Sequence, residues 1–225
     1  MKLLSVSSDA KTSKGEARGW LTGILYLAPA RQAGGVNLCP HASPGCLTAC
    51  HYSAGRGAFS NVQRARIAKT RRYLTDREGF LADLRDDIGS LMARAQREGK
   101  RPCVRLNGTS DIAWERTGVF ELFPDVRFYD YTKNGRRMLD FIDRKFPSNY
   151  HLTFSRSETN QTEALEVLAR GGNVSVVFRE PPVSWRGFPV VSGDETDLRF
   201  LDTPGYVIAL TAKGKAKTDA SGFVL

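Results

Sequence analysis

Three of the four cysteines in this chain lie within one short segment, where they could bind a metal together. Cys39, Cys46 and Cys50 follow the spacing C-x6-C-x3-C in the string CPHASPGCLTACHYSAGRG. The prolines and glycines of this string interrupt both the helical and the strand period. We therefore expect a loop that is held by something other than a backbone hydrogen-bond ladder. Thiolates gathered around a metal would hold it.

Three thiolates leave either a fourth protein ligand or an open coordination position. A structural zinc site takes four ligands, and His41, His51 or Cys103 could supply the fourth. Cys103 starts a predicted strand, so we expect it to be a buried apolar cysteine instead. Three cysteines with one open iron is the pattern of a 4Fe-4S cluster that binds a small molecule at its unique iron. A nucleophilic cysteine with a histidine would account for one thiol and not for three.

The composition is that of an ordinary globular protein. Of the 225 residues, 41% are hydrophobic and 25% are charged. No apolar run approaches the ~20 residues of a membrane span, and the polar start does not read as a signal peptide. We expect a single α/β domain over residues 1–225, with a polar segment (1–19) before a barrel-like core (20–225). We also expect a cytoplasmic, reducing location, where clustered cysteines are more often metal ligands or catalytic thiols than disulfides.

The chain is basic, with a net charge of +9. This balance favours polyanionic partners such as DNA, RNA, nucleotides or anionic cofactors. Many of the positive charges fall between residues 56 and 101 on predicted helices, where a solvated helix face is the alternative explanation. We expect an anionic small molecule, a nucleotide or a nucleic acid as partner, and no membrane. The sequence leaves the oligomeric state open.

Apolar strands alternate with helices along most of the chain. The first strand spans about Leu21 to Ala28 and leads directly into the cysteine loop. A basic helix follows from Ser60, and a second helix starts at Thr75 or Asp76. Several further strand candidates follow, most of them separated by helix-sized segments, which predicts a parallel sheet with helical crossovers. We expect a partial (β/α)6-like barrel with the cysteine loop after its first strand, and an open doubly wound sheet as the second choice.

Polar residues follow the predicted strands. These segments are Asn107–Asp111, Asp130–Asn134, Ser155–Glu158, Arg179–Glu180, Ser192–Asp194 and Lys213–Lys217. Because parallel strands deliver their carboxyl ends to one rim, we expect these side chains to converge on the cysteine loop. Turn formation and helix capping are the alternatives for Ser110, Asp111 and Asp194. A surface ion pair is the alternative for Arg156 and Glu158.

Several strings of the chain together resemble one known family. The cysteine string, RLNGTSDI, YDYTK, HLTFSRSE and the closing KGKAKTDASGFV look like an uncharacterised bacteriophage protein family known as gene product eighty-eight. The likeness covers nearly the whole chain from Trp20. That family brings no function with it.

The three-cysteine loop after a first strand also resembles the radical SAM superfamily, whose fold is a partial (β/α)6 barrel. In that superfamily three cysteines hold a 4Fe-4S cluster, and S-adenosylmethionine chelates the open iron. The chain departs from the superfamily's usual C-x3-C-x2-C spacing and has no clear glycine-glycine-glutamate motif.

The radical SAM resemblance implies a role for each group of site residues. Cys39, Cys46 and Cys50 would bind the cluster. The implied contacts to the cofactor are Tyr52, Asn107, Ser110, Asp111, Asp194 and Lys213. The implied catalytic residues are Tyr131, Lys133, Arg156 and Glu158. Among these, Lys133 and Arg156 would favour an anionic substrate, while Tyr131 or Glu158 would serve in proton or hydrogen transfer.

The resulting expectation is an Fe-S enzyme of radical SAM type that acts on an anionic substrate, with a reductant protein as electron source. Nucleotide or nucleic-acid modification is the expected reaction class, by association only. One alternative is a zinc-stabilised nucleic-acid-binding protein without catalysis. Another is a metal-independent barrel hydrolase that uses Asp111, Asp130, Glu158 and Asp194.

Overall fold

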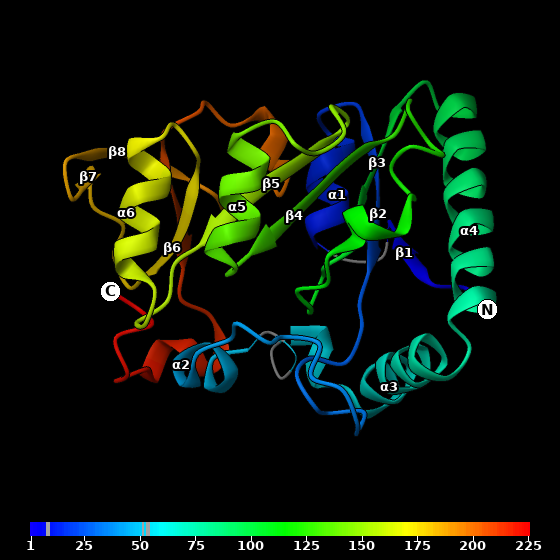
Figure 1. The fold of residues 1–225 in the computed structure, drawn as a ribbon, viewed down its shortest axis with the longest axis horizontal. Helices are drawn as coiled ribbons and strands as arrows, with labels where there is room; N and C mark the ends of the chain where they lie inside the picture. The colour runs from blue at the N-terminus through cyan, green and yellow to red at the C-terminus, as the bar shows by residue number, and fades with distance from the viewer. Residues whose placement is uncertain (8–9, 51, 53–54) are drawn as a thin grey trace.

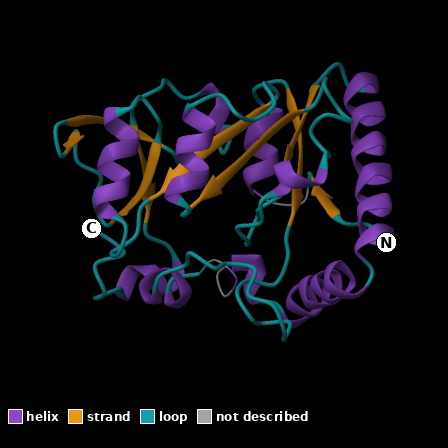
Figure 2. Ribbon diagram, viewed as in Figure 1, coloured by secondary structure: helices purple, strands orange, loops and turns teal. Residues whose placement is uncertain are grey.

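The structure is a computed structural model that describes residues 1–7, 10–50, 52 and 55–225. The described residues form a nine-stranded sheet with the order β1-β2-β3-β4-β5-β6-β9-β8-β7 (Figures 1 and 2). The strands are β1 (Leu4–Val6), β2 (Trp20–Leu25), β3 (Arg101–Arg105), β4 (Arg127–Thr132), β5 (Tyr150–Ser155), β6 (Val174–Phe178), β7 (Ser184–Trp185), β8 (Phe188–Ser192) and β9 (Val207–Thr211). The helices are α1 (Ala10–Glu16), α2 (Pro44–Thr48), α3 (Ser60–Thr75), α4 (Arg77–Arg97), α5 (Gly135–Ile142) and α6 (Gln161–Ala169). Short 3₁₀ turns are η2 (Gly55–Ala58), η3 (Trp114–Thr117), η4 (Arg199–Leu201) and η5 (Gly214–Thr218).

The sheet is mostly parallel and open. From β2 to β8, every neighbouring pair of strands in the sheet is parallel. Strands β1 and β7 are antiparallel to their neighbours and lie at the two edges. The predicted α/β class is confirmed, but the barrel is not, because the described residues form an open sheet. Closure would pair the outer parallel strands, and β1 instead covers β2 at one edge.

Strands β2 to β6 lie side by side in chain order because each crossover between them carries a helix or a helical turn. Their carboxyl ends therefore meet at one edge of the sheet. We call this the C-terminal edge. It is where β2, β3, β4, β5 and β6 end at Leu25, Arg105, Thr132, Ser155 and Phe178. The cysteine segment, α2, α3 and η5 all lie along this edge (Figure 1).

One face of the sheet carries the main hydrophobic core. Helix α4 buries Phe80, Leu84, Ile88, Leu91 and Ala95 there, at the helical spacing that the sequence predicts. Its cap is Asp76, whose side chain accepts a hydrogen bond from the Gly79 backbone N–H. Helices α5 and α6 cover the same face, as Figure 2 shows.

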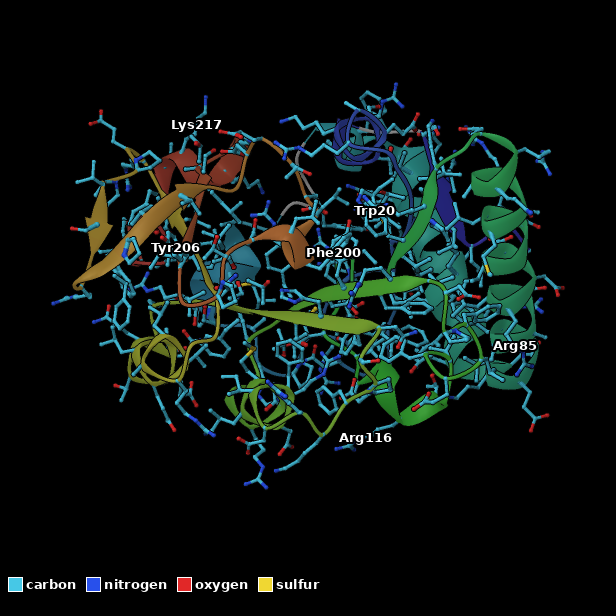
Figure 3. The ribbon with its side chains drawn as sticks, turned by 90° about the horizontal axis from the view of Figure 1, so that it is seen from above. Trp20, Arg85, Arg116, Phe200, Tyr206 and Lys217 are labelled. Atoms are coloured by element: carbon cyan, nitrogen blue, oxygen red, sulfur yellow. The ribbon has the colours of Figure 1, made fainter. Side chains whose placement is uncertain are left out.

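The opposite face carries a smaller aromatic cluster and many polar groups. Trp20 meets Phe200 of η4 in a T-shaped contact with ring centroids 4.7 Å apart (Figure 3). Along β4 the side chains alternate, so that Phe128 enters the main core while Tyr129 joins the smaller cluster. We call this side of the sheet the inner face.

The first residues belong to the fold. The segment expected as polar (1–19) contributes β1, and Leu3 and Leu4 are buried in the main core. The Leu3 and Leu4 backbone N–H groups both donate to Asp87 of α4. No helix in the described part of the chain has the length and apolar character needed to cross a membrane.

Candidate metal centre

The segment after β2 crosses the C-terminal edge and carries three thiols. The Ala28 backbone N–H donates to Thr70 of α3 at 2.8 Å, which ties the start of the segment to that helix. Leu38 is buried, and its carbonyl accepts from the Asp111 backbone N–H at 2.8 Å. These contacts fix the backbone immediately before Cys39.

The three thiols share one environment. The Cys39 Sγ accepts from the Ala30 backbone N–H at 3.3 Å and donates to the Thr109 carbonyl at 3.7 Å. Burial raises the pKa of Cys39 to about 11, and the nearby Cys46 and Cys50 add to this rise. Burial also raises the pKa of Cys50, and Cys46 again contributes. All three predicted ligands are half-buried, and Cys46 and Cys50 lie close enough to Cys39 to raise the pKa of its thiol.

Cys46 lies on a short helix where the sequence led us to expect none. Pro44 and Gly45 occupy the first turn of α2, and the Ser43 hydroxyl accepts from the Cys46 backbone N–H at 3.2 Å. Proline is compatible with the first position of a helix because that N–H has no partner within the helix. The prediction that Pro44 interrupts helical structure was therefore wrong.

Glu158 anchors this helix. Its two carboxylate oxygens accept from the Ser43 hydroxyl and from the Gly45 backbone N–H, both at 2.7 Å. The ion pair of Glu158 with Arg156, which was the alternative to a catalytic role, is not formed between these two side chains. Arg156 instead donates to the carbonyls of Gly222 and Phe223, at 2.5 Å and 3.1 Å.

The C-terminal segment packs directly behind the cysteine helix. A Cβ added to Gly45 would lie 2.7 Å from Phe223 Cβ and 2.8 Å from a Glu158 oxygen. Only glycine allows the backbone to approach this closely. Val224 forms a parallel bridge to Val177 of β6, which holds the segment in place. Arg156 and Glu158, both predicted to be catalytic, thus position the loop and its backing in the structure. A direct role in chemistry stays a prediction for both.

Two cations lie near Cys50. Arg66 of α3 and Lys133 after β4 both lower the pKa of the Cys50 thiol, against the larger effect of burial. The Arg66 guanidinium lies over the rings of Tyr26 and Tyr52, at 4.8 Å and 5.7 Å from their centroids. Lys133 and Tyr52 were predicted site residues, whereas Arg66 was not. In the sequence, Arg66 is one of several arginines on a predicted basic helix, and nothing distinguishes it from the others.

Lys133 reaches toward the loop from the neighbouring strand end. Its Nζ donates to Ser155 Oγ at 2.7 Å and lies 5.5 Å from the centroid of the Phe223 ring. It therefore lies between the end of β5 and the C-terminal segment that backs the cysteine helix.

The residues after β3 form a compact internal network. The Asn107 Oδ1 accepts from Ser110 Oγ, from the Ile112 backbone N–H and from Trp114 Nε1. Asp111 accepts from Thr132 Oγ1 and pairs with Arg137 at 3.1 Å. Asn107, Ser110 and Asp111 therefore shape the loop beside Cys39, and their predicted contact with a cofactor stays a prediction.

Tyr131 lies on the inner face, within a buried polar cluster that the sequence did not reveal. Its hydroxyl donates to Asp197 at 3.4 Å, and the Arg105 guanidinium lies 4.5 Å from the centroid of its ring. Arg105 pairs with Asp197 at 2.8 Å. Burial raises the pKa of Tyr131 well above its usual value, and Asp197 adds to the rise. Arg105 Nε and Thr153 Oγ1 are buried without a hydrogen-bond partner in the described part of the chain.

Asp194 and Lys213 pair with each other at the far end of the edge. The Lys213 Nζ donates to Asp194 at 2.5 Å, and the Thr211 backbone N–H donates to the same carboxylate at 2.9 Å. Burial alone would raise the pKa of Asp194, but these hydrogen bonds lower it to about 2. The two residues occupy the predicted rim, and their contact with a cofactor stays a prediction.

The fourth-ligand candidates differ in position. Cys103 is fully buried with its Sγ 3.2 Å from Thr22 Oγ1, which confirms that it is a buried cysteine apart from the loop. His41 is exposed, and His51 lies outside the described residues. Within the described ranges, no group of three or more His, Cys, Asp or Glu side chains is placed to hold a metal ion.

The donor chemistry nevertheless fits an iron–sulfur cluster. Three thiols come from one loop; Cys46 and Cys50 raise the pKa of Cys39, and Cys46 raises the pKa of Cys50. Thiolate is the usual ligand of such clusters. Arg66 and Lys133 add positive charge beside Cys50, where a thiolate-bound cluster would carry negative charge.

Comparisons with known proteins give one result. The chain matches no curated protein and no solved structure at the level searched. The family model described as gene product 88 matches residues 2–225. This match spans nearly the whole chain, and the protein therefore belongs to the gene product 88 family.

Proposed function

We propose that Cys39, Cys46 and Cys50 hold a 4Fe-4S cluster with one open iron, and that the protein is an Fe-S enzyme of radical SAM type acting on an anionic substrate. One observation carries the proposal. Three cysteines lie on one loop after the first parallel strand, at the C-terminal edge where β2 to β6 follow chain order, and Cys46 and Cys50 both raise the pKa of Cys39. We interpret β2 to β6 with β9 as the open counterpart of the partial (β/α)6 barrel that the sequence suggested.

The protein's own residues would position and balance the cluster. Glu158 fixes the helix that carries Cys46 through Ser43 and Gly45. Arg66 and Lys133 would offset the negative charge next to Cys50. A cluster with bound S-adenosylmethionine supplies reductive cleavage of that cofactor as the start of hydrogen abstraction.

The inner face supports cofactor binding beside the loop. Arg105 Nε and Thr153 Oγ1 are buried there without hydrogen-bond partners in the described residues. Buried polar groups of this kind are usually satisfied, so they fit a site that a bound molecule or ordered water completes. Tyr52, Asn107, Ser110, Asp111, Asp194 and Lys213 are the cofactor contacts that we propose around it. Tyr131, Lys133, Arg156 and Glu158 are the catalytic residues that we propose.

A reducing, cytoplasmic location and a reductant protein belong to the same proposal, because the cluster must receive an electron before it can act. A hydrolase without metal is a weaker alternative. Its four carboxylates, Asp111, Asp130, Glu158 and Asp194, all accept hydrogen bonds within the protein.

The test is purification without oxygen, followed by iron, sulfide and zinc analysis and an absorption spectrum. We would compare the wild type with Cys46→Ala and with Cys103→Ala. The last is a matched control, because Cys103 is buried apart from the loop. About four irons and four sulfides per chain in the wild type and in Cys103→Ala, with loss in Cys46→Ala, supports the proposal.

Two other results would reject it. One zinc per chain without sulfide would favour the zinc-stabilised nucleic-acid-binding protein, for which the basic surface of α3 is the supporting observation. Neither metal in the wild type would remove the metal centre altogether.

A further inference from the structure

The positive charge of the protein is concentrated in one segment. No Asp or Glu lies between Glu16 and Asp76, a stretch that contains β2, the cysteine loop and α3. The basic residues of this stretch are Arg18, Arg31, Arg56, Arg64, Arg66, Lys69, Arg71 and Arg72. The cysteine loop and α3, which belong to this stretch, lie along the C-terminal edge (Figure 1).

Helix α3 divides its basic residues between two faces. The face against the sheet buries Arg66, Thr70 and Tyr73. The outward face exposes Arg64 and Arg71, which are seven residues apart and so lie on one side of the helix, about 10 Å apart along its axis. Neither has an ion-pair partner in the part of the chain that the structure describes. Their local charge is thus not neutralised.

A second basic element flanks the cysteine helix on the other side. Turn η5 buries Ala216 and exposes Lys215 and Lys217, the latter labelled in Figure 3. A groove of about 520 Å³ runs between α2 and η5, with Gly45 and Lys215 among its lining residues. Hydroxyl groups also line it, from Thr48, Thr218 and Ser221. Asp219 lines it too, and its carboxylate accepts from Ser221 Oγ and from the Val224 backbone N–H. Cationic and hydroxyl groups of this kind are the usual partners of phosphate oxygens.

Exposed apolar side chains lie within the same surface. Phe59, directly before α3, is 59% exposed, and Leu47 of α2 is 48% exposed. Phe59 precedes Arg64 by five residues, and an exposed aromatic ring near exposed cations along the chain can act as a stacking platform for an unpaired base.

We propose that this surface binds single-stranded nucleic acid, with phosphates on Arg64 and Arg71 of α3 and on Lys215 and Lys217 of η5, and with a base stacked on Phe59. The strand crosses the cysteine loop, which lies between the two basic elements. If the proposed Fe-S centre is present, this nucleic acid is its substrate, and only that role as substrate rests on the proposed function. Binding itself does not require the cluster.

The experiment measures fluorescence anisotropy of a short labelled single-stranded oligonucleotide with the full-length protein. Four phosphate contacts predict a slope of about −2.8 for log K against log salt, or about a 50-fold loss of affinity between about 50 and 200 mM. The double variant Arg64→Gln/Arg71→Gln should reduce the slope to about −1.4. Phe59→Ala should weaken binding at least about fivefold and leave the slope unchanged.

The control is Arg85→Gln/Arg116→Gln, which removes two exposed arginines from α4 and η3 (Figure 3). It changes the net charge as much as the α3 double variant does. If this control has the same affinity and the same salt slope as the wild type, the result supports binding at the surface of α3 and η5. An equal loss in both double variants would overturn it and indicate a non-specific effect of net charge.

Three further results decide the partner. Tighter binding of a duplex than of the single strand would overturn the stacked-base geometry. Binding to anionic lipid vesicles without binding to the oligonucleotide would replace nucleic acid with a membrane surface. If Cys46→Ala still binds the oligonucleotide, nucleic-acid binding does not require the cluster, and the surface proposal stands even if the cluster proposal fails. If Cys46→Ala loses binding, the proposal that binding is independent of the cluster is contradicted.

Discussion

Helices α3 and α4 follow one another across a single residue, Asp76, yet they are built for different tasks. Helix α4 buries an apolar stripe that includes Phe80 and Leu84 and belongs to the main core. Helix α3 buries Arg66 and Thr70. The Thr70 hydroxyl accepts a hydrogen bond from the Ala28 backbone N–H, and the Arg66 guanidinium lies over the Tyr26 ring, so both contact the segment that leads to the thiols. Helix α3, on the C-terminal edge, thus contacts the segment that leads to the cysteine loop, whereas α4 packs into the main core.

The same contrast separates the cysteines. Cys103 is fully buried, and burial raises the pKa of its thiol to about 12. The loop cysteines are half-buried, and Cys50 has Arg66 and Lys133 beside it. One residue type is therefore used for packing in the sheet and, by our proposal, for ligation at its edge.

The largest expected effect tests the scaffold side of the comparison. Phe80 is fully buried and contacts the rings of Tyr73 and Trp114 at 5.3 Å and 6.5 Å. Phe80→Ala should lower the free energy of unfolding by about 3–5 kcal/mol, because it leaves a cavity in the core. Urea denaturation measures this. The matched control is Phe59→Ala, where the ring is 59% exposed and the loss should stay within about 0.5 kcal/mol. Equal losses would show that the comparison is mistaken.

A smaller effect is expected where the scaffold holds the loop. Glu158→Gln removes the charge from two hydrogen bonds to the cysteine helix and should cost about 1–3 kcal/mol. The loss should be local, so hydrogen exchange should speed up at the amides of Gly45 to Thr48. Glu166→Gln on the exposed side of α6 is the control. Unchanged exchange in Glu158→Gln would mean that other contacts hold α2.

The smallest effect concerns the ion pair at the rim. The pKa of Asp194 is lowered to about 2, below its usual value. The folded state therefore binds the proton less readily than the unfolded state. The stabilisation is fully present above about pH 4 and is lost as the pH falls toward about 2. Because the partner Lys213 is exposed, the pair should contribute only about 0.2–1 kcal/mol. Denaturation of wild type and Asp194→Asn should differ by this amount near pH 7 and converge in acid. A difference that persists in acid would assign the effect to packing.

Local patterns were enough to predict the elements of the scaffold but not the open sheet that replaces the expected barrel. The apolar stripe of α4, its start at Thr75 or Asp76 and the parallel strands follow from periodicity and alternation, which depend on neighbouring residues. The role of Cys103 as a buried cysteine followed from its place in a strand. The extent of the sheet did not, because β1 adds buried leucines from a segment that reads as polar.

The site was only partly predictable. The three cysteines were visible because they are close in sequence, but their surroundings come from distant segments. The contact of Arg66 with Tyr26 depends on how α3 docks, and the Arg105–Asp197 pair joins residues from separate elements. The sequence suggested that Glu158 is catalytic or pairs with Arg156, whereas in the structure its carboxylate accepts hydrogen bonds from Ser43 and Gly45 and anchors α2.

The most direct test of the central proposal is electron paramagnetic resonance of the reduced protein, prepared without oxygen, before and after S-adenosylmethionine is added. We predict the signal of a reduced 4Fe-4S cluster that changes when the cofactor binds the open iron, and no such signal in Cys46→Ala. A wild-type protein that carries zinc and gives no signal, or a cluster signal that the cofactor leaves unchanged, would contradict the proposal.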